Sequence, residues 1–360
     1  MKTPKIKDQI KNEIINGKFG ASGTLFPNTE TLMDLYDISF VSALKIINDL
    51  IKERLLIKIG NKKYIVCGIY SKQSHLYRIT TKSNDKKIGI ILRSISNPYY
   101  SIVSENLYQL AHKNGYDFVI KLTTIETEAD ALFDLIREGV LGIFSFSPEN
   151  TSHTIELYSR LPIPVVFIGK DFPYKPSNCV KSNNYASGYH AAKHLHECGY
   201  TSLYYIQQNA IQSGSDSRKN GFFAYCKEHS LSCNIDTPLF CDIKNKENNN
   251  HIVFTLKNDK DKRIGLFCFH DLIAINLFEL LSYHKFNIPE ALGLVGYDKI
   301  DNISPYSSQI TTFSYSFKDI AINAWNLLQE NIENLNMQPK IIEIPTILVI
   351  RASTIKLQKT

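Results

Sequence analysis

Several side chains that can bind a ligand come directly after apolar runs of the sequence. Tyr99 and Tyr100 follow KIGIILRSISNP, and an aromatic ring there can stack on the apolar face of a sugar or a base. His270 follows IGLFCF, and Asp298 ends LGLVGYD, where a carboxylate can accept hydrogen bonds from two hydroxyl groups. Lys170 follows PVVFIG and suits an anionic group. These residue types point to binding of a small polar molecule.

Arg218 adds a planar donor to this set. It opens a predicted helix in SRKNGF, and its fork of five fixed N–H donors suits vicinal hydroxyls or a carboxylate. Each of these residues also has a purely structural interpretation: a surface salt bridge for Arg218, packing of a wall for the two tyrosines, and a capped loop for His270.

Catalytic and metal-binding motifs are not expected in this chain. GxSxG, HExxH, P-loop and GxGxxG patterns do not occur between a predicted strand and helix. His190, His194 and His196 line one predicted helix, but no nearby carboxylate or cysteine completes a metal site. The seven cysteines include no CxxC and are expected to be buried thiols. We therefore expect no enzyme, no metal and no cofactor.

Composition indicates a globular protein with one basic region. Hydrophobic residues make up 43% and charged residues 21%, and no apolar run reaches the roughly 20 residues of a membrane span. The N-terminus lacks the apolar stretch of a secretion signal, so a cytoplasmic location without membrane contact is expected. Residues 1–70 carry eleven Lys or Arg against seven Asp or Glu, which concentrates +4 of the total +6 there. A polyanionic partner or a lysine-rich surface would explain this excess.

The elements at the N-terminus have the order helix, helix, helix, hairpin. Residues 5–16 place isoleucines on one helical face, and helices follow at about 29–36 and 40–53, the second capped by Ser39. LLIKIG and KKYIVCG then form two short strands joined at Gly60 and Asn61. This is the order of a winged helix-turn-helix.

The remaining chain alternates strands and helices. Apolar runs such as KIGIIL, LGIFSF, SLYYIQ and LGLVGY recur between helical segments, which is typical of parallel sheets covered on both faces. More than one sheet is needed for so many units, so we predict an α/β fold with two Rossmann-like lobes. The predicted boundaries divide the chain into the helical region with its hairpin over 1–69, a linker over 70–86, and the two lobes over 87–360.

Residues 26–50, FPNTETLMDLYDISFVSALKIINDL, resemble the winged helix of GntR-type regulators. Pro27, Leu32, Ile38, Ser39 and Ile47 fall on matching positions, and ERLLIKIGNKKYIV resembles the family's wing. The resemblance implies a recognition helix in the major groove and lysines of the wing on phosphates. The candidate contacts with double-stranded operator DNA are Asn28, Thr29, Ser39, Phe40, Ser42, Lys45, Lys62 and Lys63.

The resemblance has departures that bear on base recognition. The family usually has Arg where this chain has Phe40, and Glu-Arg where it has Thr29 and Glu30. Bidentate reading by arginine is therefore absent at the usual places, and Phe40 either contacts a thymine methyl or belongs to the core.

Residues 87–354 resemble the effector domain of LacI/GalR-type regulators. The motifs that carry the resemblance include KIGIILRSISNPYY, LPIPVVFIGK, VKSNNYASGYHAAKHL, SRKNGFFAYC and ALGLVGYDK, in the family's order. It implies a type I periplasmic-binding-protein-like sensor, two lobes crossed three times by the chain, and a ligand cleft at strand ends. Gly169 and Lys170 replace a frequent Asp-Arg, and Asn183 replaces an acidic residue. A standard hexose is therefore uncertain as ligand.

The leading hypothesis is a homodimeric repressor whose operator binding is controlled by a small, sugar-like effector. A sensor whose head has lost DNA specificity is one alternative, and a solute-binding protein is another. The basic N-terminal region and the absence of an export signal argue against the last. The sequence does not identify the effector, the operator or the direction of the response.

Overall fold

The computed structural model describes residues 2–15, 18–20, 24–53, 55–60, 63–66, 86–124, 126–146, 158, 161–170, 176–208, 217–234, 239–259, 262–335 and 337–355. The chain divides into two compact units. Unit 1 comprises Met1–Val180 and Phe317–Ile342, and unit 2 comprises Lys181–Ser316 and Glu343–Thr360. The chain therefore passes between the units three times, as the sequence predicted. Most of the predicted linker lies outside the described residues, and Lys86 begins a strand.

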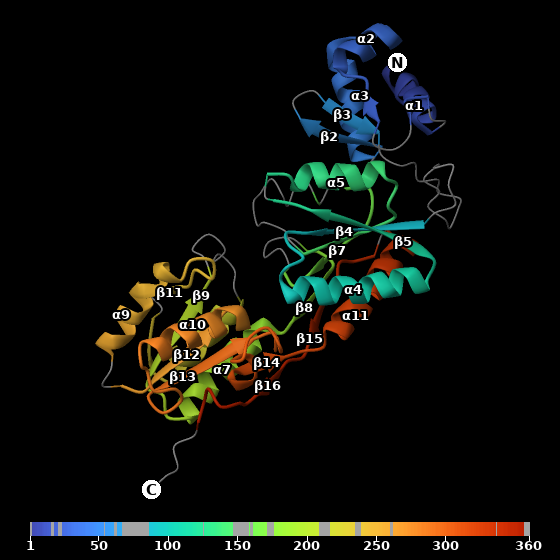
Figure 1. Cartoon of the computed structure of the whole chain (residues 1–360). Coiled ribbons are helices and arrows are strands. Elements are labelled where there is room, and N and C mark those ends of the chain that lie inside the picture. The colour runs from blue at the N-terminus through green and yellow to red at the C-terminus, as the bar shows by residue number, and fades with distance from the viewer. Residues whose placement is uncertain are drawn as a thin grey trace. The chain divides into compact units, whose positions relative to one another are not determined.

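The first 66 residues are called the head below, and their described part contains three helices and three short strands (Figure 1). The elements are α1 (Lys2–Ile15), β1 (Leu25–Phe26), α2 (Thr29–Tyr36), α3 (Phe40–Lys52), β2 (Leu56–Gly60) and β3 (Lys63–Val66). The strands form an antiparallel sheet in the order β1-β3-β2. The core of the head contains Ile10 and Ile14 of α1, Leu32 of α2, and Ile47 and Leu50 of α3. The apolar periodicity of the three helices is thus used to bury one face of each.

Short polar side chains set the boundaries of α2 and α3. The Asn28 carboxamide oxygen accepts from the backbone N–H of Thr31 at 2.8 Å, and the Ser39 hydroxyl accepts from that of Ser42 at 3.3 Å. Both bonds satisfy an N–H group that the first helical turn leaves without an intrahelical partner. Asp37 ends α2 with a φ of 49°, the left-handed conformation that Asp tolerates better than most residues. This turn redirects the chain into α3.

Unit 1 contains a six-stranded sheet in the order β15-β8-β7-β6-β4-β5. Its strands are β4 (Lys86–Leu92), β5 (Tyr116–Leu122), β6 (Ile143–Ser145), β7 (Val165–Ile168), β8 (Cys179–Ser182) and β15 (Ile341–Ile344). The pairs β5–β4, β4–β6, β6–β7 and β7–β8 are parallel. Helix α5 (Glu128–Arg137) covers one face, and α4 (Pro98–Lys113) and α11 (Phe317–Glu333) cover the other (Figure 1).

Unit 2 has a seven-stranded sheet, with the path β10-β9-β12-β13-β14-β16 and β11 paired to β9. Its strands are β9 (Ser202–Gln207), β10 (Ser232–Cys233), β11 (Leu239–Phe240), β12 (Ile264–Cys268), β13 (Leu292–Tyr297), β14 (Thr311–Ser314) and β16 (Ile347–Val349). Its helices are α7 (Asn184–Glu197), α8 (Ser217–Glu228), α9 (Asn250–Asn258) and α10 (Asp271–Tyr283), with 3-10 turns at Lys246–Asn249 and Ser307–Gln309. The β14–β16 pair is antiparallel, and the other pairs of this sheet are parallel.

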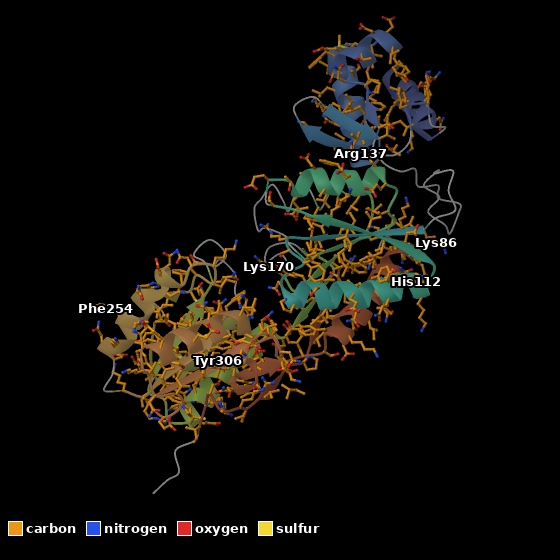
Figure 2. The ribbon with its side chains drawn as sticks, viewed as in Figure 1. Lys86, His112, Arg137, Lys170, Phe254 and Tyr306 are labelled. Carbon is orange, nitrogen blue, oxygen red and sulfur yellow. The ribbon has the colours of Figure 1, made fainter. Side chains whose placement is uncertain are left out.

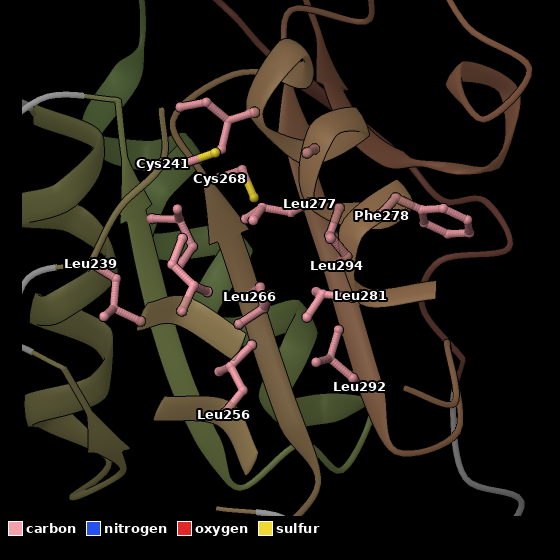
Figure 3. Packing of buried hydrophobic residues seen from close by; sticks show 14 of the residues in the cluster. Leu239, Cys241, Leu256, Leu266, Cys268, Leu277, Phe278, Leu281, Leu292 and Leu294 are labelled. Atoms are coloured by element: carbon pink, nitrogen blue, oxygen red, sulfur yellow. The ribbon is translucent and has the colours of Figure 1, made fainter. Parts of the chain in front are cut away.

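The core of unit 2 explains why its central strands β12 and β13 are apolar. Figure 3 shows Leu266 of β12 and Leu294 of β13 packed with Leu277 of α10. Cys241 and Cys268 belong to the same cluster and are fully buried. Six cysteines in the described part of the chain are free thiols, and five of them are buried, which confirms the prediction for those five. Cys67 lies outside the described residues.

Candidate functional site

The carboxyl ends of β9, β12 and β13 bring the predicted ligand residues of unit 2 to one edge of the sheet. These parallel strands are neighbours in the order β9-β12-β13. Gln208 follows β9, His270 lies two residues beyond β12, and Asp298 follows β13. Open parallel sheets bind ligands beyond this edge. The strand ends therefore give unit 2 a candidate binding edge.

Arg218 reaches this edge from the first turn of α8. Its guanidinium carbon lies 4.1 Å from the ring centroid of Phe269 and 4.3 Å from that of Tyr297. One Nη atom donates a hydrogen bond to the backbone carbonyl of Phe269. Two rings and a carbonyl hold the planar cation in place, so the direction of its donors is fixed by packing.

A crossing of two glycines positions the helix that carries Arg218. A Cβ on Gly188 of α7 would lie 1.8 Å from the carbonyl oxygen of Arg218, and one on Gly221 of α8 would lie 2.0 Å from that of Tyr185. Neither position has space for any side chain, since these distances are far below van der Waals contact. The two helices therefore approach backbone to backbone, and this fixes where α8 begins.

His270 has the structural role that the sequence offered as the alternative. Its Nδ1 accepts from the backbone N–H of Ile273 at 3.3 Å and caps α10, while its Nε2 donates to the carboxamide oxygen of Gln208 at 3.0 Å. Burial lowers the pKa of His270 to about 3, with a smaller contribution from the charge of Arg218. The ring is neutral and both nitrogens are engaged, so the interpretation as a ligand contact is replaced by that of a cap.

Asp298 is the carboxylate of the predicted ligand set, and it follows Tyr297, whose ring contacts Arg218. Its Oδ1 accepts from the hydroxyl of Tyr315 at 2.7 Å, and its backbone φ of 95° is unusual for a residue with a side chain. Burial raises the pKa of Asp298, whereas the charge of Arg218 lowers it. The two groups thus interact electrostatically at the same edge, although the carboxylate is only 8% exposed.

Asp271 was missed by the sequence analysis. Its Oδ2 accepts from the backbone N–H of Ile300 at 2.8 Å, and its Oδ1 accepts from the hydroxyl of Thr312 at 2.7 Å. A Cβ on Gly296 would lie 2.0 Å from that Oδ1, so only glycine fits there. Burial raises the pKa of Asp271 to about 7. This carboxylate ties the start of α10 to the loop that carries Asp298, and its acidic residue type at a helix start was the available signal.

In unit 1 the two predicted tyrosines belong to an aromatic cluster. Tyr99 and Tyr100 occupy the first turn of α4, which Asn97 caps by accepting from the N–H of Tyr99 at 2.9 Å. The Tyr99 ring lies 5.9 Å from Phe146, which follows β6, and 6.0 Å from Phe317, which begins α11. Tyr99, Tyr100 and Phe317 are half-buried, so the cluster is only partly covered within unit 1.

Gly169 is explained by this cluster. Its φ is 88°, and a Cβ there would lie 2.8 Å from the hydroxyl oxygen of Tyr99. The tyrosine therefore fills the space that a side chain at position 169 would need, which accounts for glycine where the resemblance suggests aspartate. Lys170 follows it at the carboxyl end of β7, half-buried (Figure 2).

A second polar network in unit 1 was not predicted. Arg93 follows β4, and one of its Nη atoms lies 3.8 Å from the carboxylate of Glu128, which is buried at the start of α5. The hydroxyl of Tyr158 donates to the other oxygen of Glu128 at 2.5 Å and lies 2.8 Å from the hydroxyl of Ser145. Glu128 sits on an otherwise amphipathic helix, so its burial could not be seen from residue type.

In the head, the predicted DNA contacts divide into exposed and structural groups. Phe40, Lys45 and Lys63 are exposed, and Ser42 is half-buried. Thr29 is only 3% exposed and is removed from the set because it packs at the start of α2. Asn28 and Ser39 serve as helix caps. Lys62 lies outside the described residues.

A metal site and a membrane span are not found in the described part of the chain. No group of three His, Cys, Asp or Glu side chains there could hold an ion. His194, one of the histidines on α7, is buried with its Nε2 2.9 Å from the hydroxyl of Thr354. None of the described helices has the length and apolar character to cross a membrane.

Comparisons with known proteins identify the fold of the chain and a sequence relative. Residues 192–354 match the model of a periplasmic binding protein-like domain. The fold is periplasmic-binding-protein-like. The HTH-type transcriptional repressor PurR of Actinobacillus pleuropneumoniae serotype 5b (strain L20) is 27% identical over 278 residues, 76% of this chain and 82% of that protein. The matched domain does not include the head.

Two solved structures share the periplasmic-binding-protein-like fold. A LacI family transcriptional regulator from Enterococcus faecium with bound ribose has a TM-score of 0.62 at 20% identity and covers 76% of this chain and 100% of its own. A periplasmic binding protein/LacI transcriptional regulator from Alkaliphilus metalliredigens QYMF, complexed with D-xylulofuranose, has a TM-score of 0.63 at 22% identity, with 75% and 100% coverage.

Proposed function

We propose that this protein is a transcriptional regulator whose binding to operator DNA is controlled by a small ligand, a sugar or sugar derivative. The observation that carries the ligand part is that Arg218 packs on the ring of Tyr297 and that Asp298, the next residue, follows β13 at the carboxyl edge of the unit 2 sheet. A fixed fork of donors beside a carboxylate acceptor complements adjacent hydroxyl groups. The PurR relative is named a transcriptional repressor, and the two solved structures contain ribose and D-xylulofuranose.

The head supports the DNA part of the proposal. Its three helices and antiparallel hairpin are the elements of a winged helix-turn-helix, and the resemblance to the GntR type is carried by Pro27, Leu32 and Ile38. In this arrangement α3 enters the major groove and the β2–β3 hairpin contacts the backbone. Exposed Lys63 lies on that hairpin.

The assembly in this proposal is a homodimer on a pseudo-palindromic operator. Two copies joined through their sensor parts set the spacing between two heads, and the ligand shifts that spacing by its different affinity for two arrangements. The proposed function requires binding of DNA and ligand alone, and no catalytic role is proposed for any residue.

Thermal unfolding with a panel of sugars, sugar phosphates, sugar acids and nucleosides tests the ligand part. A ligand at a hundred times its Kd stabilises the protein by about 2.7 kcal/mol. We expect Arg218→Lys and Asp298→Asn each to weaken a positive response at least tenfold in Kd. Lys227→Ala, on an exposed turn of α8, is the control and leaves the response unchanged. A ligand that binds both variants normally would contradict the assignment of this edge.

Footprinting on the DNA upstream of the protein's own gene tests the DNA-binding part of the proposal. Discrete protection that the ligand strengthens or removes supports a regulator. Weak, uniform protection favours a sensor with a degenerate head, and absence of DNA binding with intact ligand binding favours a solute-binding protein.

A further inference from the structure

The outward face of α3 is apolar where it begins. Phe40 is 46% exposed, Val41 is 74% exposed and Leu44 is 38% exposed. Leu44 lies four residues after Phe40 and three after Val41, so it neighbours both on one side of the first two helical turns. Large apolar side chains gathered on one short stretch of surface mark a site of interaction.

These side chains are not surplus members of the core of the head. The inward positions of α3 are filled by Ala43, Ile46, Ile47 and Leu50, which are all at most 1% exposed. Helix α3 therefore has two apolar faces, and burial of the head's own core accounts for one of them.

The polar groups of the same turn are already engaged. The Ser39 hydroxyl accepts from the backbone N–H of Ser42, and the two serine hydroxyls lie 3.1 Å apart with Ser39 as donor. The first turn of α3 consequently offers a partner mainly C–H surface, in place of the arginine that would offer two parallel donors to guanine.

The charge of the surroundings identifies the partner. Lys45 is exposed beside Leu44 on α3, and Lys63 is exposed on β3. Residues 1–70 carry a net charge of +4. A polyanion complements this charge, and the major groove of DNA presents an apolar group at one unmodified base, the C5 methyl of thymine.

We infer that α3 recognises operator DNA chiefly through thymine methyl groups, with Phe40, Val41 and Leu44 as the residues that determine specificity. Each half-site then carries thymines where a head with arginine would require guanines, and Lys45 supplies affinity through the phosphates. This inference rests on the proposed DNA-binding function and names the base chemistry that it reads.

Deoxyuridine substitution tests it directly. Full-length protein first selects its preferred sites from a pool of random duplexes, and each thymine of the selected site is then replaced singly by deoxyuridine. This change removes one methyl group and keeps every hydrogen-bonding group of the base pair. We expect a three- to fivefold loss of affinity at two or more positions, the effect of one buried methyl group.

Variants of the exposed side chains connect the effect to α3. Val41→Ala and Leu44→Ala change surface residues and leave the core of the head intact. We expect each to abolish the deoxyuridine effect at one thymine and retain it at the others, as in a double-mutant cycle. Asn48→Ala, an exposed change further along α3, is the matched control and retains every effect. Lys45→Ala weakens all sites equally and reduces the salt dependence.

The outcomes separate this inference from the function on which it rests. Sequence-specific binding that is insensitive to deoxyuridine everywhere overturns the inference and leaves the regulator intact. Deoxyuridine effects that persist unchanged in both Val41→Ala and Leu44→Ala also overturn it, because another element then contacts the methyl groups. Absence of specific DNA binding overturns both the inference and the DNA part of the proposed function.

Discussion

His270 and Asp271 are adjacent in the chain, and the same burial moves their pKa values in opposite directions. It disfavours the charged form of each group, so it lowers the pKa of His270 to about 3 and raises that of Asp271 to about 7. The unfolded chain has ordinary values of about 6.5 and 3.9. Protonation therefore has opposite effects on the stability of the folded state at these two positions.

Replacement of His270 by Asn removes a source of acid sensitivity. Between about pH 3 and 6.5 the unfolded chain binds more protons at His270 than the folded protein, so stability rises with pH. Asn still caps α10 and does not titrate. We expect the wild type to lose about 2 kcal/mol relative to His270→Asn between pH 7 and pH 5, measured by urea unfolding. A constant difference across this range would show that His270 titrates in the folded protein as it does in the unfolded chain.

Asp271→Asn has the opposite pH dependence. The folded protein binds more protons at Asp271 between about pH 4 and 7, so the contribution of this residue to stability falls as pH rises, by roughly 1.4 kcal/mol per pH unit. The neutral variant avoids this loss, and its stability relative to the wild type increases from pH 5 to pH 8. Urea unfolding at both pH values measures the change. A relative stability that stays level would contradict burial of the charged carboxylate.

The apolar pattern predicted where elements begin and end better than it predicted the roles of individual residues. Arg218 lies at a helix start and Asp298 follows a strand, as predicted, because both element boundaries could be recognised from the apolar pattern. His270 and Thr29 could not be assigned correctly, since a cap and a buried threonine differ from surface contacts only in tertiary packing. Glu128 was missed for the same reason.

At the scale of elements, the crossing of α7 and α8 determines where Arg218 lies. Gly188 and Gly221 are each placed against the backbone of the other helix. Glycine in a helix interior costs up to about 1 kcal/mol relative to alanine, so sequence propensity alone counts against both positions. Their purpose becomes visible only in the packed pair, which is why the sequence predicted the two helices and not their contact.

Gly188→Ala tests this positioning role. The added methyl meets the Arg218 carbonyl and forces the helices apart, at a cost of about 1–3 kcal/mol in the free energy of unfolding. We also expect a weaker response to the ligand found in the thermal panel, because the guanidinium moves with α8.

Gly115→Ala is the control for Gly188→Ala. Its φ is 74°, and a Cβ there meets nothing within 4 Å, so it loses about 1 kcal/mol to backbone strain alone and keeps its ligand affinity. Equal ligand affinity in both variants would exclude the proposed role of the crossing.

Strands and helices could be predicted where apolar and polar residues recur with the period of a strand or a helix. The predicted helices over 29–36 and 40–53 match α2 and α3 to within one residue at each end. The two-residue strands β10 and β11 were not predicted, because so short a run has no periodicity and its pairing depends on β9. The sequence pattern places Val41 and Leu44 on the same apolar stripe as Ile47 and Leu50, and only the structure shows that the first two are exposed and the last two buried.

For the whole molecule, the proposed function requires that ligand and operator influence each other equally. If the ligand changes operator affinity by some factor, the operator must change ligand affinity by the same factor. Typical couplings of 1–3 kcal/mol correspond to about 5- to 150-fold. Titrations of each partner in the presence and absence of the other measure both factors, and unequal values would mean that the two ligands act on different assemblies.

Because the chain passes three times between the units, unit 1 cannot finish folding until late in synthesis. The head is contiguous, so all of its elements have left the ribosome early in synthesis. Unit 1 is completed only by Phe317–Ile342, where Leu328 packs beside Gly142 and Trp325 faces Phe144. At a translation rate of about 5–20 residues per second, many seconds pass between synthesis of the first strands of unit 1 and synthesis of α11, which covers them. A chaperone that shields apolar sheet surface thus has a defined interval in which to act, and it ends when α11 docks.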